Sequence, residues 1–414
     1  MASFAPVSEQ LAIVTRGIVD NPMEGELSAR LAESAKNGTA LRVKAGFDPT
    51  RPDLHLGHAV LLTKLRQFQD LGHTAILLVG DFTALVGDPT GQNDLRPRLT
   101  REEVTAAAKT YTDQAFRILD AERTEVRFNS EWLGKMTSFE MVELLAKQTV
   151  SRMLERNDFA QRHGEGRPIW QHEFLYPLLQ GYDSVALASD LELGGTDQLF
   201  NLLMGRDLQG KYGQRGQMVL TVPILEGTDA KIDSATGKVV GKKMSKSAGN
   251  YVGLREAPAE MYRKMLQIDD LVIWRYFELL SARSSADIAS LRASESNPMA
   301  VKGAFAREMI ARFHSAEDAT RAEEEFKRVY SGDAVPENVP VFEFVTEGAG
   351  MWLPKALVEA QLVKSTSDGR RLVEQGGVEV DGGRASDPKA TLQAGEYLLR
   401  VGSKNRKFAR IVVR

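Results

Sequence analysis

The chain contains no cysteine among its 414 residues. Disulfides and thiolate chemistry are therefore excluded, and a zinc site would have to be built from only six histidines together with carboxylates. Long apolar runs are also missing, since none approaches the roughly 20 residues that a membrane-spanning helix needs. Residues 1–10 lack a basic segment followed by an apolar core, so they do not predict a secretory signal. These absences favour a cytoplasmic enzyme without a membrane partner and without a protein-bound metal.

Two common nucleotide-binding fingerprints are absent as well. No Gly-x-Gly-x-x-Gly follows the first predicted strand, and no Gly-x-x-x-x-Gly-Lys-Ser/Thr occurs anywhere in the chain. Neither the dinucleotide fingerprint nor the P-loop therefore applies to this sequence.

Charge is distributed unevenly along the chain. The whole sequence has 53 Lys and Arg against 56 Asp and Glu, a net charge of −3. Residues 351–414 contain 12 Lys and Arg against 7 Asp and Glu, a net of +5, which leaves −8 for the remainder. A small basic segment on an acidic body is typical of a protein with a polyanionic partner, although surface solvation alone also produces such a difference. The length allows two or three domains.

A strand, an irregular loop and a helix follow one another near the N-terminus. Leu41–Phe47 has the pattern of a buried strand, and helical spacing of apolar residues begins at Ala59. His55 and His58 lie three residues apart, which places both near one face of the first helical turn. Gly57 between them lets a ligand approach the backbone, and the helix N-terminus suits an anion. The pattern predicts a nucleotide-phosphate site, with two surface histidines beside a turn as the alternative.

Strands and helices then alternate, which predicts a parallel, doubly wound α/β sheet. His73–Gly80 and Val219–Leu225 are apolar runs typical of strands covered on both faces. Thr100–Asp120 has the pattern of a helix, and Glu125–Asn129 that of a short strand. The turn-rich segment Val86–Gln92 follows one of these strands, at the edge where open α/β sheets bind ligands.

A polar stripe interrupts a helical segment in the middle of the chain. Tyr176, Gln180 and Asp183 lie at positions i, i+4 and i+7, so they share one face of a helix. A phenol, an amide and a carboxylate on one face must satisfy their hydrogen bonds. The stripe therefore either faces solvent or lines a polar pocket.

Two further segments have the composition of nucleotide-binding loops. Gly194–Gln198 joins a predicted strand to the helical run Leu199–Leu208, and Asp197 there is either a ligand for ribose hydroxyls or an ordinary N-cap. The loop Thr236–Gly249 contains Lys-Met-Ser-Lys-Ser at Lys243–Ser247. Two lysines three residues apart beside hydroxyls predict a loop that folds over a polyphosphate, and a solvated basic loop is the alternative.

Together these segments resemble a known family. His-Leu-Gly-His followed 185 positions later by Lys-Met-Ser-Lys-Ser resembles the signature pair of class I aminoacyl-tRNA synthetases. The stretches between them, with the Tyr176–Gln180–Asp183 stripe, resemble the bacterial-type tyrosyl-tRNA synthetase family; they are Gly46–Thr50, Val86–Gly91 and Gly194–Gln198. The resemblance implies a Rossmann-like catalytic domain over 1–250, a helical anticodon-stem domain over 251–330, a linker over 331–350 and an S4-like RNA-binding domain over 351–414.

The resemblance also implies partners and residue roles. The partners would be L-tyrosine, ATP with Mg²⁺, tRNA(Tyr) and a second copy in a homodimer. The implied catalytic residues are His55, His58, Lys243 and Lys246. The implied ATP-binding residues are these four with Asp48, Thr50, Gly57, Gly195, Asp197 and Ser247. The implied tyrosine-binding residues are Lys44, Asp88, Tyr176, Gln180, Asp183 and Gln198, with Asp183 accepting the phenol proton.

One position departs from the family pattern. Many members carry a tyrosine two residues before the glycine of Gly-Phe-Asp-Pro-Thr, and its hydroxyl contacts the substrate phenol, whereas this chain has Lys44. We therefore expect Asp183 to carry most of the selection of tyrosine over phenylalanine, alone or with a water. On the sequence alone, Lys44→Tyr is expected to change selectivity little or to improve it.

The C-terminal part of the chain has a different organisation. Ala257–Tyr330 is predicted to be helical throughout, and Ser331–Pro340 has the composition of a linker. The remainder is predicted to contain two helices, Leu353–Leu362 and Ser367–Gln375, followed by the strands Val378–Val380, Tyr397–Val401 and Phe408–Val413. It resembles the S4-type RNA-binding module, with phosphate contacts implied for Lys364, Arg370, Arg371, Lys404, Arg406 and Lys407. A generic α+β appendage is the alternative.

A rival hypothesis for the whole chain is a non-catalytic RNA-binding paralogue that kept the fold. Intact His-Leu-Gly-His and Lys-Met-Ser-Lys-Ser segments argue against it, since a pure binder has no use for them.

Overall fold

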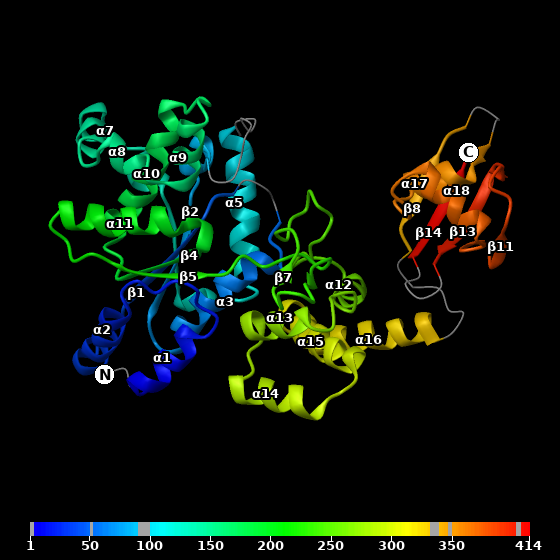
Figure 1. The fold of residues 1–414 in the computed structure, drawn as a ribbon, viewed down its shortest axis with the longest axis horizontal. Helices are drawn as coiled ribbons and strands as arrows, with labels where there is room; N and C mark the ends of the chain where they lie inside the picture. The colour runs from blue at the N-terminus through cyan, green and yellow to red at the C-terminus, as the bar shows by residue number, and fades with distance from the viewer. Residues whose placement is uncertain (1–3, 50–52, 90–99, 332–338, 347–349, 403–406) are drawn as a thin grey trace. The chain divides into compact units, whose positions relative to one another are not determined.

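The structure is a computed structural model, shown in Figure 1, and it forms two compact units divided within one helix, Met1–Ala319 and Thr320–Arg414. It describes residues 4–49, 53–89, 100–331, 339–346, 350–402 and 407–414. Among these residues, no helix combines the length and the apolar character needed to cross a bilayer.

The first unit is built on a parallel five-stranded sheet with the order β3-β2-β1-β4-β5. Its strands are β1 Arg42–Phe47, β2 Thr74–Val79, β3 Thr124–Phe128, β4 Leu191–Gly195 and β5 Met218–Val222. The parallel α/β sheet predicted from the sequence is thus confirmed. The chain runs outward from β1 to β2 and β3, then returns to place β4 on the other side of β1. This reversal makes β1 and β4 the switch point, where ligands bind outside the carboxyl ends of such strands.

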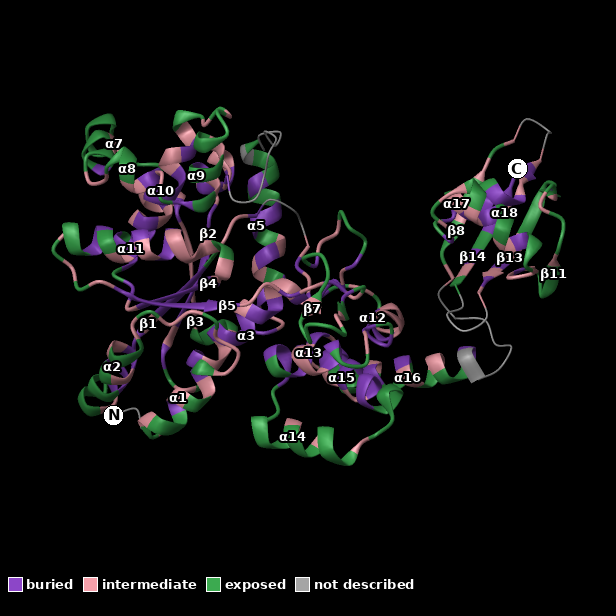
Figure 2. Cartoon of the chain, viewed as in Figure 1, coloured by how far each residue is buried: buried purple, intermediate pink, exposed green. Residues whose placement is uncertain are grey.

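Helices cover the sheet on both sides (Figures 1 and 2). Those of the first 211 residues are α1 Val7–Thr15, α2 Glu24–Asn37, α3 Leu56–Asp70, α4 Thr83–Val86, α5 Arg101–Ala115, α6 Ser130–Leu133, α7 Ser138–Leu145, α8 Val150–Met153, α9 Asn157–Gly164, α10 Gln171–Leu187 and α11 Leu199–Lys211. Two 3₁₀ turns, Ala121–Arg123 and Thr196–Gln198, lie among them. The sheet is purple in Figure 2 because its strands are mostly buried, as their apolar runs predict.

Close packing between α10 and α11 depends on a glycine. A Cβ on Gly181 would lie 2.8 Å from Leu208 Cδ1, closer than real Cβ contacts, and 3.1 Å from Met204 Cγ, which is tighter than most of them. The two helices therefore approach each other closely at Gly181. This contact sets the position of α10, which carries the predicted polar stripe.

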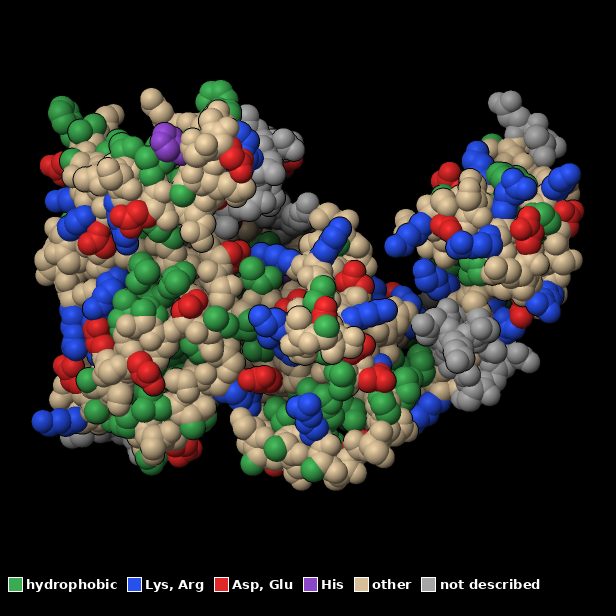
Figure 3. Space-filling view, viewed as in Figure 1, with side chains coloured by type: hydrophobic (Ala, Val, Ile, Leu, Met, Phe, Trp, Pro, Cys, Tyr) green, Lys and Arg blue, Asp and Glu red, His purple; other side chains and the backbone are tan. Residues whose placement is uncertain are grey.

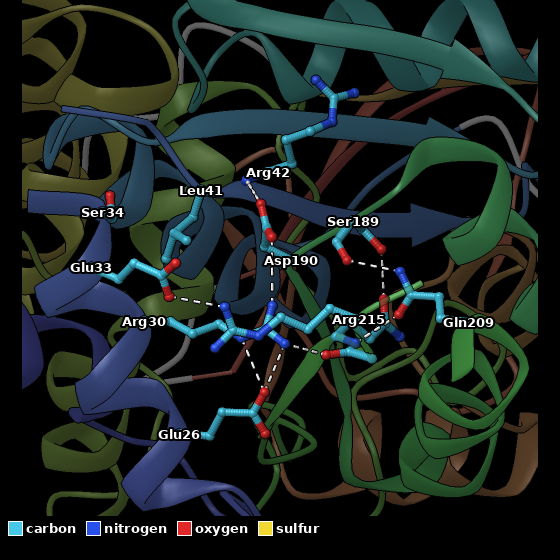
Figure 4. A network of polar contacts seen from close by, with 12 residues as sticks. Glu26, Arg30, Glu33, Ser34, Leu41, Arg42, Ser189, Asp190, Gln209 and Arg215 are labelled. Atoms are coloured by element: carbon cyan, nitrogen blue, oxygen red, sulfur yellow. Dashed lines mark hydrogen bonds and ion pairs between the residues drawn. The ribbon is translucent and has the colours of Figure 1, made fainter. Parts of the chain in front are cut away.

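A buried arginine anchors α2 to the sheet (Figure 4). Arg30 is 2% exposed, and its guanidinium lies 2.7 Å from Glu26 and 3.5 Å from Asp190, just before β4. Asp190 also accepts a hydrogen bond of 2.8 Å from the amide of Arg42 at the start of β1. A buried charge needs such partners. Through Asp190 the network joins α2 to the amino ends of β1 and β4.

The remainder of the first unit is a hairpin followed by helices. β6 Lys231–Ile232 and β7 Val239–Val240 form the hairpin, which the sequence did not predict. The helices are α12 Pro258–Met265, α13 Val272–Leu280, α14 Ser285–Ser294, α15 Pro298–Phe313 and α16 Ala316–Ser331, in agreement with the predicted helical segment. Tyr276 of α13 donates a 2.6 Å hydrogen bond to the carbonyl of Glu226, which ties these helices to the loop after β5. The predicted catalytic region and the helices α12–α15 thus lie in one compact unit, and α16 continues from it into the second unit.

The second unit contains a five-stranded sheet with the order β11-β10-β13-β14-β8. Its elements are β8 Val341–Phe344, β9 Met351–Trp352, α17 Leu353–Glu359, α18 Thr366–Glu374, β10 Val378–Val380, β11 Gly383–Ala385, β12 Thr391–Leu392, β13 Gly395–Val401 and β14 Lys407–Val413. Leu357, Val373, Leu399 and Ile411 are among its buried core residues.

One strand lies inside the segment predicted as a linker. β8 pairs in parallel with β14, with Val341 opposite Arg410 and Phe344 opposite Val413. Four residues after Pro340 are too few to show a convincing strand period in the sequence. The C-terminal sheet therefore begins before the predicted boundary at residue 351.

Candidate active site

A cavity of about 1170 Å³ opens at the carboxyl ends of β1 and β4, and most of the predicted site residues line it. The residues implied for ATP that line it are Asp48, His55, His58, Gly195, Asp197, Lys243, Lys246 and Ser247. The residues implied for tyrosine that line it are Asp88, Tyr176, Gln180, Asp183 and Gln198. Gly57 lies beside it in the first turn of α3, and Thr50 falls outside the described residues. We call His55, His58, Lys243 and Lys246 the histidine–lysine end, and Tyr176, Gln180 and Asp183 the Asp183 end.

The two histidines cap α3 and are held as hydrogen-bond donors. His55 Nδ1 accepts from the amide of Gly57 at 3.1 Å, and His58 Nδ1 accepts from the amide of His55 at 3.2 Å. An imidazole nitrogen that accepts carries no proton, so each neutral ring has its N–H at Nε2. A Cβ on Gly57 would lie 2.9 Å from His55 Cε1, so a side chain there would disturb this arrangement.

Both imidazoles are neutral at physiological pH. Burial, with smaller contributions from His58, Lys243 and Lys246, lowers the pKa of His55 to about 2. Burial, with the charge of Lys243, also lowers the pKa of His58 to about 4. The ring centroids lie 4.1 Å apart. The pair therefore offers two neutral N–H donors rather than two positive charges.

Lys243 and Lys246, in the loop after β5, are both paired with carboxylates. Lys243 Nζ lies 3.3 Å from Asp197 Oδ2, and Lys246 pairs with Asp53. Between them, the side chain of Met244 is buried and its amide donates to the carbonyl of Leu225. The backbone of the loop is thus anchored while the two ammonium groups face the cavity, where an anion could replace their carboxylate partners.

Asp48 joins the two ends of the cavity. Its Oδ2 accepts a 2.8 Å hydrogen bond from the hydroxyl of Tyr176, and its Oδ1 accepts a 2.7 Å hydrogen bond from Thr83. Burial, reinforced by Asp48 and other carboxylates, raises the pKa of Tyr176 well above its usual value, so the phenol keeps its proton. A Cβ on Gly80 would lie 2.0 Å from Asp48 Oδ1, which explains the glycine there. Asp48 was predicted as an ATP ligand, and the structure adds this contact with Tyr176.

A chain of amides crosses the floor of the cavity beside Asp88. Gln198 Nε2 donates to Asp88 Oδ2 at 2.8 Å, and Asn201 Nδ2 donates to Gln198 at 3.0 Å and to Gln180 at 2.9 Å. Arg156 donates to Asp88 Oδ1 at 3.0 Å. The sequence analysis missed Asn201 and Arg156. Asn201 could have been found from its spacing of three after Gln198, whereas nothing local marked Arg156.

Asp183 is a buried carboxylate with two fixed donors. It is 2% exposed; Oδ1 accepts from Trp132 Nε1 at 2.8 Å, and Oδ2 accepts from Asn129 Nδ2 at 3.3 Å. Burial raises its pKa to about 7, against the lowering effects of Lys44 and of these two donors. Trp132 and Asn129 were not predicted, because they come from a distant segment. With Tyr176 only 5% exposed, the polar stripe faces the cavity rather than solvent.

Lys44 is not where the sequence analysis expected it. Its side chain is fully buried on β1, and Nζ lies 3.0 Å from Oε1 of Glu192, its register partner on β4. Glu192 lines the cavity, whereas Lys44 does not. Lys44 and Gly46 are two residues apart on β1 and therefore lie on the same face of the strand. Gly46 is nearer the carboxyl end of β1 and lines the cavity, whereas Lys44 does not. The structure therefore places Lys44 behind the site and not in direct reach of a ligand.

The predicted RNA-contacting residues of the second unit are exposed where they are described. Lys364, Arg370, Arg371 and Lys407 are all at the surface, and Arg371 donates to Asp368 at 3.0 Å. Lys404 and Arg406 fall outside the described residues. Figure 3 shows several Lys and Arg side chains on the visible face of this unit.

Comparisons with known proteins agree with this arrangement. The family model "tRNA synthetases class I (W and Y)" matches residues 36–331, and the S4 domain model matches residues 351–396. A tyrosine–tRNA ligase of Desulfotalea psychrophila is 50% identical over 411 residues, which cover 98% of each chain. One of Bordetella parapertussis is 51% identical over 408 residues, 98% of this chain and 96% of that one.

Solved structures share the fold of the first unit. A C-terminally truncated mitochondrial tyrosyl-tRNA synthetase of Aspergillus nidulans has a TM-score of 0.64 at 19% identity, over 78% of this chain and 94% of that one. A tyrosyl-tRNA synthetase of Archaeoglobus fulgidus, complexed with L-tyrosine, has a TM-score of 0.59 at 24% identity, over 77% of this chain and 99% of that one.

Proposed function

The chain belongs to the bacterial-type tyrosyl-tRNA synthetases of class I, and we propose that it activates tyrosine in the cavity at the β1–β4 switch point. It is a tyrosine–tRNA ligase: it forms tyrosyl-adenylate from tyrosine and ATP and transfers the tyrosyl group to the 3′ end of tRNA(Tyr). The observation that carries the assignment of the site is that one cavity brings the histidine–lysine end and the Asp183 end together.

At the Asp183 end, the substrate phenol would donate to the Asp183 carboxylate. Trp132 and Asn129 already occupy one donor position on each oxygen, so the carboxylate is held in one orientation with lone pairs left for the substrate. Asp88, Tyr176 and Gln180 would hold the tyrosine ammonium, with Gln198 near its carboxylate. The amide chain through Asn201 keeps these acceptors in place.

At the histidine–lysine end, the tyrosine carboxylate attacks the α-phosphorus of ATP and pyrophosphate leaves. The neutral His55 and His58 donate from Nε2 to phosphoryl oxygens, and Lys243 and Lys246 neutralise the leaving pyrophosphate. The barrier falls through positioning and charge stabilisation, so no protein nucleophile is needed. Asp197 would accept hydrogen bonds from the ribose.

Mg²⁺ would enter with ATP and neutralise phosphate charge. Mg²⁺ is bound mainly by substrate phosphates and waters, with few protein ligands. In the described part of the chain, no group of three or more His, Asp or Glu side chains is placed to hold a metal ion.

The second unit would bind tRNA. Its S4-domain match, the net positive charge of residues 351–414 and the exposed Lys364, Arg370, Arg371 and Lys407 support contacts with phosphates. The helices α12–α16 would contact the anticodon stem, as the family resemblance implies. We propose cytoplasmic action, which the absence of cysteine also suits.

An apolar surface on α7 and α8 supports a homodimer. Phe139 is 87% exposed, Val142 63% and Val150 64%, and Leu145 lies on the same helix as the first two. Figure 2 shows these two helices as mostly exposed. An exposed cluster of this kind marks an interface, and a second copy of the chain is the partner we propose for it.

Tyrosine-dependent ATP–pyrophosphate exchange tests the site, and charging of tRNA(Tyr) tests the whole reaction. We expect exchange with tyrosine and little with phenylalanine. RNA binding without exchange would instead favour the non-catalytic paralogue.

A further inference from the structure

The roles above leave one charged pair behind the Asp183 end unexplained. Lys44 on β1 and Glu192 on β4 face each other across the parallel sheet, with exposed fractions of 0% and 1%. A buried ion pair adds little net stability, because desolvation of both charges offsets their attraction. Stability alone therefore does not account for two charges at this position.

The two partners are not equally satisfied. Glu192 Oε1 lies 3.0 Å from Lys44 Nζ, and Oε2 accepts from Ser184 Oγ at 3.2 Å and from Gln217. The ammonium of Lys44 has three donors, yet Glu192 is its only polar partner among the described residues. Its positive charge is therefore only partly compensated, and it acts on other carboxylates nearby.

The pair packs against the part of α10 that carries Asp183, because Ser184, the next residue, donates to Glu192 Oε2 at 3.2 Å. Two charged residues act on Asp183, Lys44 from β1 and Glu192 from β4, and both Asp183 and Glu192 line the cavity. The other polar neighbours of the carboxylate are the neutral donors Asn129 and Trp132. Tyr176, on the same helix, also faces it and stays protonated. Lys44 is thus the cation with the largest effect on Asp183 among the residues that the structure describes.

We propose that Lys44 is a positioning residue for tyrosine selection, because its buried ammonium is the counter-ion that keeps Asp183 a carboxylate able to accept the substrate hydroxyl. Glu192 holds the ammonium in place and opposes its effect on Asp183. The inference rests on the proposed role of Asp183. A protonated Asp183 would lose an acceptor for the phenol and would no longer be stranded as a charge when phenylalanine is bound.

Two effects on the Asp183 pKa agree with this arrangement. Lys44 lowers it more than Glu192 raises it, and burial leaves it at about 7. With a pKa of about 7, the charge state of Asp183 is sensitive to a nearby counter-ion at physiological pH. This also changes the expectation for Lys44→Tyr: that variant would leave Glu192 buried without a cation, so selectivity should fall rather than hold.

Opposite substitutions in the pair separate this role from a structural one. Lys44→Met removes the positive charge with little change in shape, and Glu192→Gln removes the negative one. The readout is the acid limb of kcat/KM for tyrosine in pyrophosphate exchange. We expect Lys44→Met to move that limb to higher pH by at least about one unit, and Glu192→Gln to move it to lower pH. If the pair served only to hold the fold, both variants would lose stability and neither would shift the limb.

The tyrosine-to-phenylalanine ratio of kcat/KM gives an independent readout. At pH 7 we expect a loss of about tenfold or more in Lys44→Met and no loss of selectivity in Glu192→Gln. The KM for ATP, which binds at the other end, should stay unchanged in both. An unshifted limb and an unchanged ratio in folded Lys44→Met would overturn the proposal.

The double variant keeps the test valid if a lone buried charge prevents folding. Lys44→Met with Glu192→Gln leaves no charge unpaired, and because Lys44 has the larger effect, its acid limb should still lie above that of the wild type. A double variant with the wild-type limb would overturn the proposal. Wild-type protein without tyrosine-dependent exchange would instead overturn the proposed function, which is a distinct result.

Discussion

At the histidine–lysine end, the side chain of Lys243 is 62% exposed and pairs with Asp197, whereas behind the Asp183 end Lys44 is 0% exposed and pairs with Glu192. Lys243 can exchange Asp197 for a phosphate group, because both side chains stay in contact with solvent. Lys44 cannot exchange Glu192 for another partner without leaving a buried charge unpaired. The histidine–lysine end therefore suits the negative charge that develops on the phosphates and leaves with pyrophosphate. The Asp183 end suits a buried charge that stays in the protein and distinguishes tyrosine from phenylalanine.

The largest expected effect comes from removing the Asp183 carboxylate itself. Asp183→Ala should reduce the tyrosine-to-phenylalanine ratio of kcat/KM by orders of magnitude, because phenylalanine would no longer strand a buried carboxylate. Discrimination of about 10⁵ against phenylalanine is a known property of this enzyme class and not a result of this structure. Exchange assays with both amino acids measure it. Normal tyrosine activation with phenylalanine still rejected would place the phenol site elsewhere.

The next largest effect comes from removing a lysine of the histidine–lysine end. Lys246→Ala should slow adenylate formation by roughly 10²–10³, the scale of one lost transition-state donor, while tyrosine binding stays nearly constant. Pre-steady-state formation of tyrosyl-adenylate separates the two quantities. Lys242→Ala, an exposed lysine in the same loop, is the matched control and should leave the rate unchanged. Equal losses in rate and in tyrosine affinity would contradict a role in the transition state.

A smaller effect is expected outside the cavity altogether. A chain ending at Ser331 should still form tyrosyl-adenylate, because both ends of the cavity precede it and no strand of the second sheet is cut. Its tRNA affinity should fall, with a lower salt dependence of binding as phosphate contacts are lost. Arg370→Ala with Arg371→Ala should reproduce part of the loss, and Lys389→Ala should not. Unchanged charging by the shortened chain at physiological salt would refute an RNA-binding role.

The smallest effect refines the Asp183 end. Trp132→Phe removes one donor that lowers the pKa of Asp183, so this pKa should rise from about 7. A carboxylate is needed, so tyrosine activation is lost as the pH falls through this pKa. Raising the pKa moves the loss to higher pH.

The histidines do not contribute to that limb, since the pKa values of His55 and His58, about 2 and about 4, lie well below it. Loss of one hydrogen bond to a charged group is worth about 1.5 kcal/mol, or roughly tenfold in selectivity. The pH profile of exchange measures the shift, and Trp274→Phe, which alters a tryptophan that stacks on Phe277, is the control. An acid limb that does not move would mean that Trp132 is not coupled to Asp183.

Local sequence was sufficient for much of this molecule. Apolar runs identified β1, β2 and β5, and strand–helix alternation predicted the parallel sheet, since period and composition report which face of an element is buried. The two signature segments and the Tyr176–Gln180–Asp183 spacing predicted residues that do line one cavity. Short strands such as β8 and β11 were missed, because three or four residues carry too little periodicity.

Only the tertiary structure decided which distant residues became neighbours. Lys44 meets Glu192 because β4 returns to pair with β1, and Asp183 meets Trp132 because Trp132 of α6 packs into the core cluster that contains Leu178 and Leu179 of α10. No spacing in the sequence encodes either contact, since both join segments separated by several other elements. Burial, which sets the pKa values of Asp183 and of the two histidines, is likewise a property of the assembled fold. The sequence by itself determined the kinds of groups present, and long-range packing decided their charge.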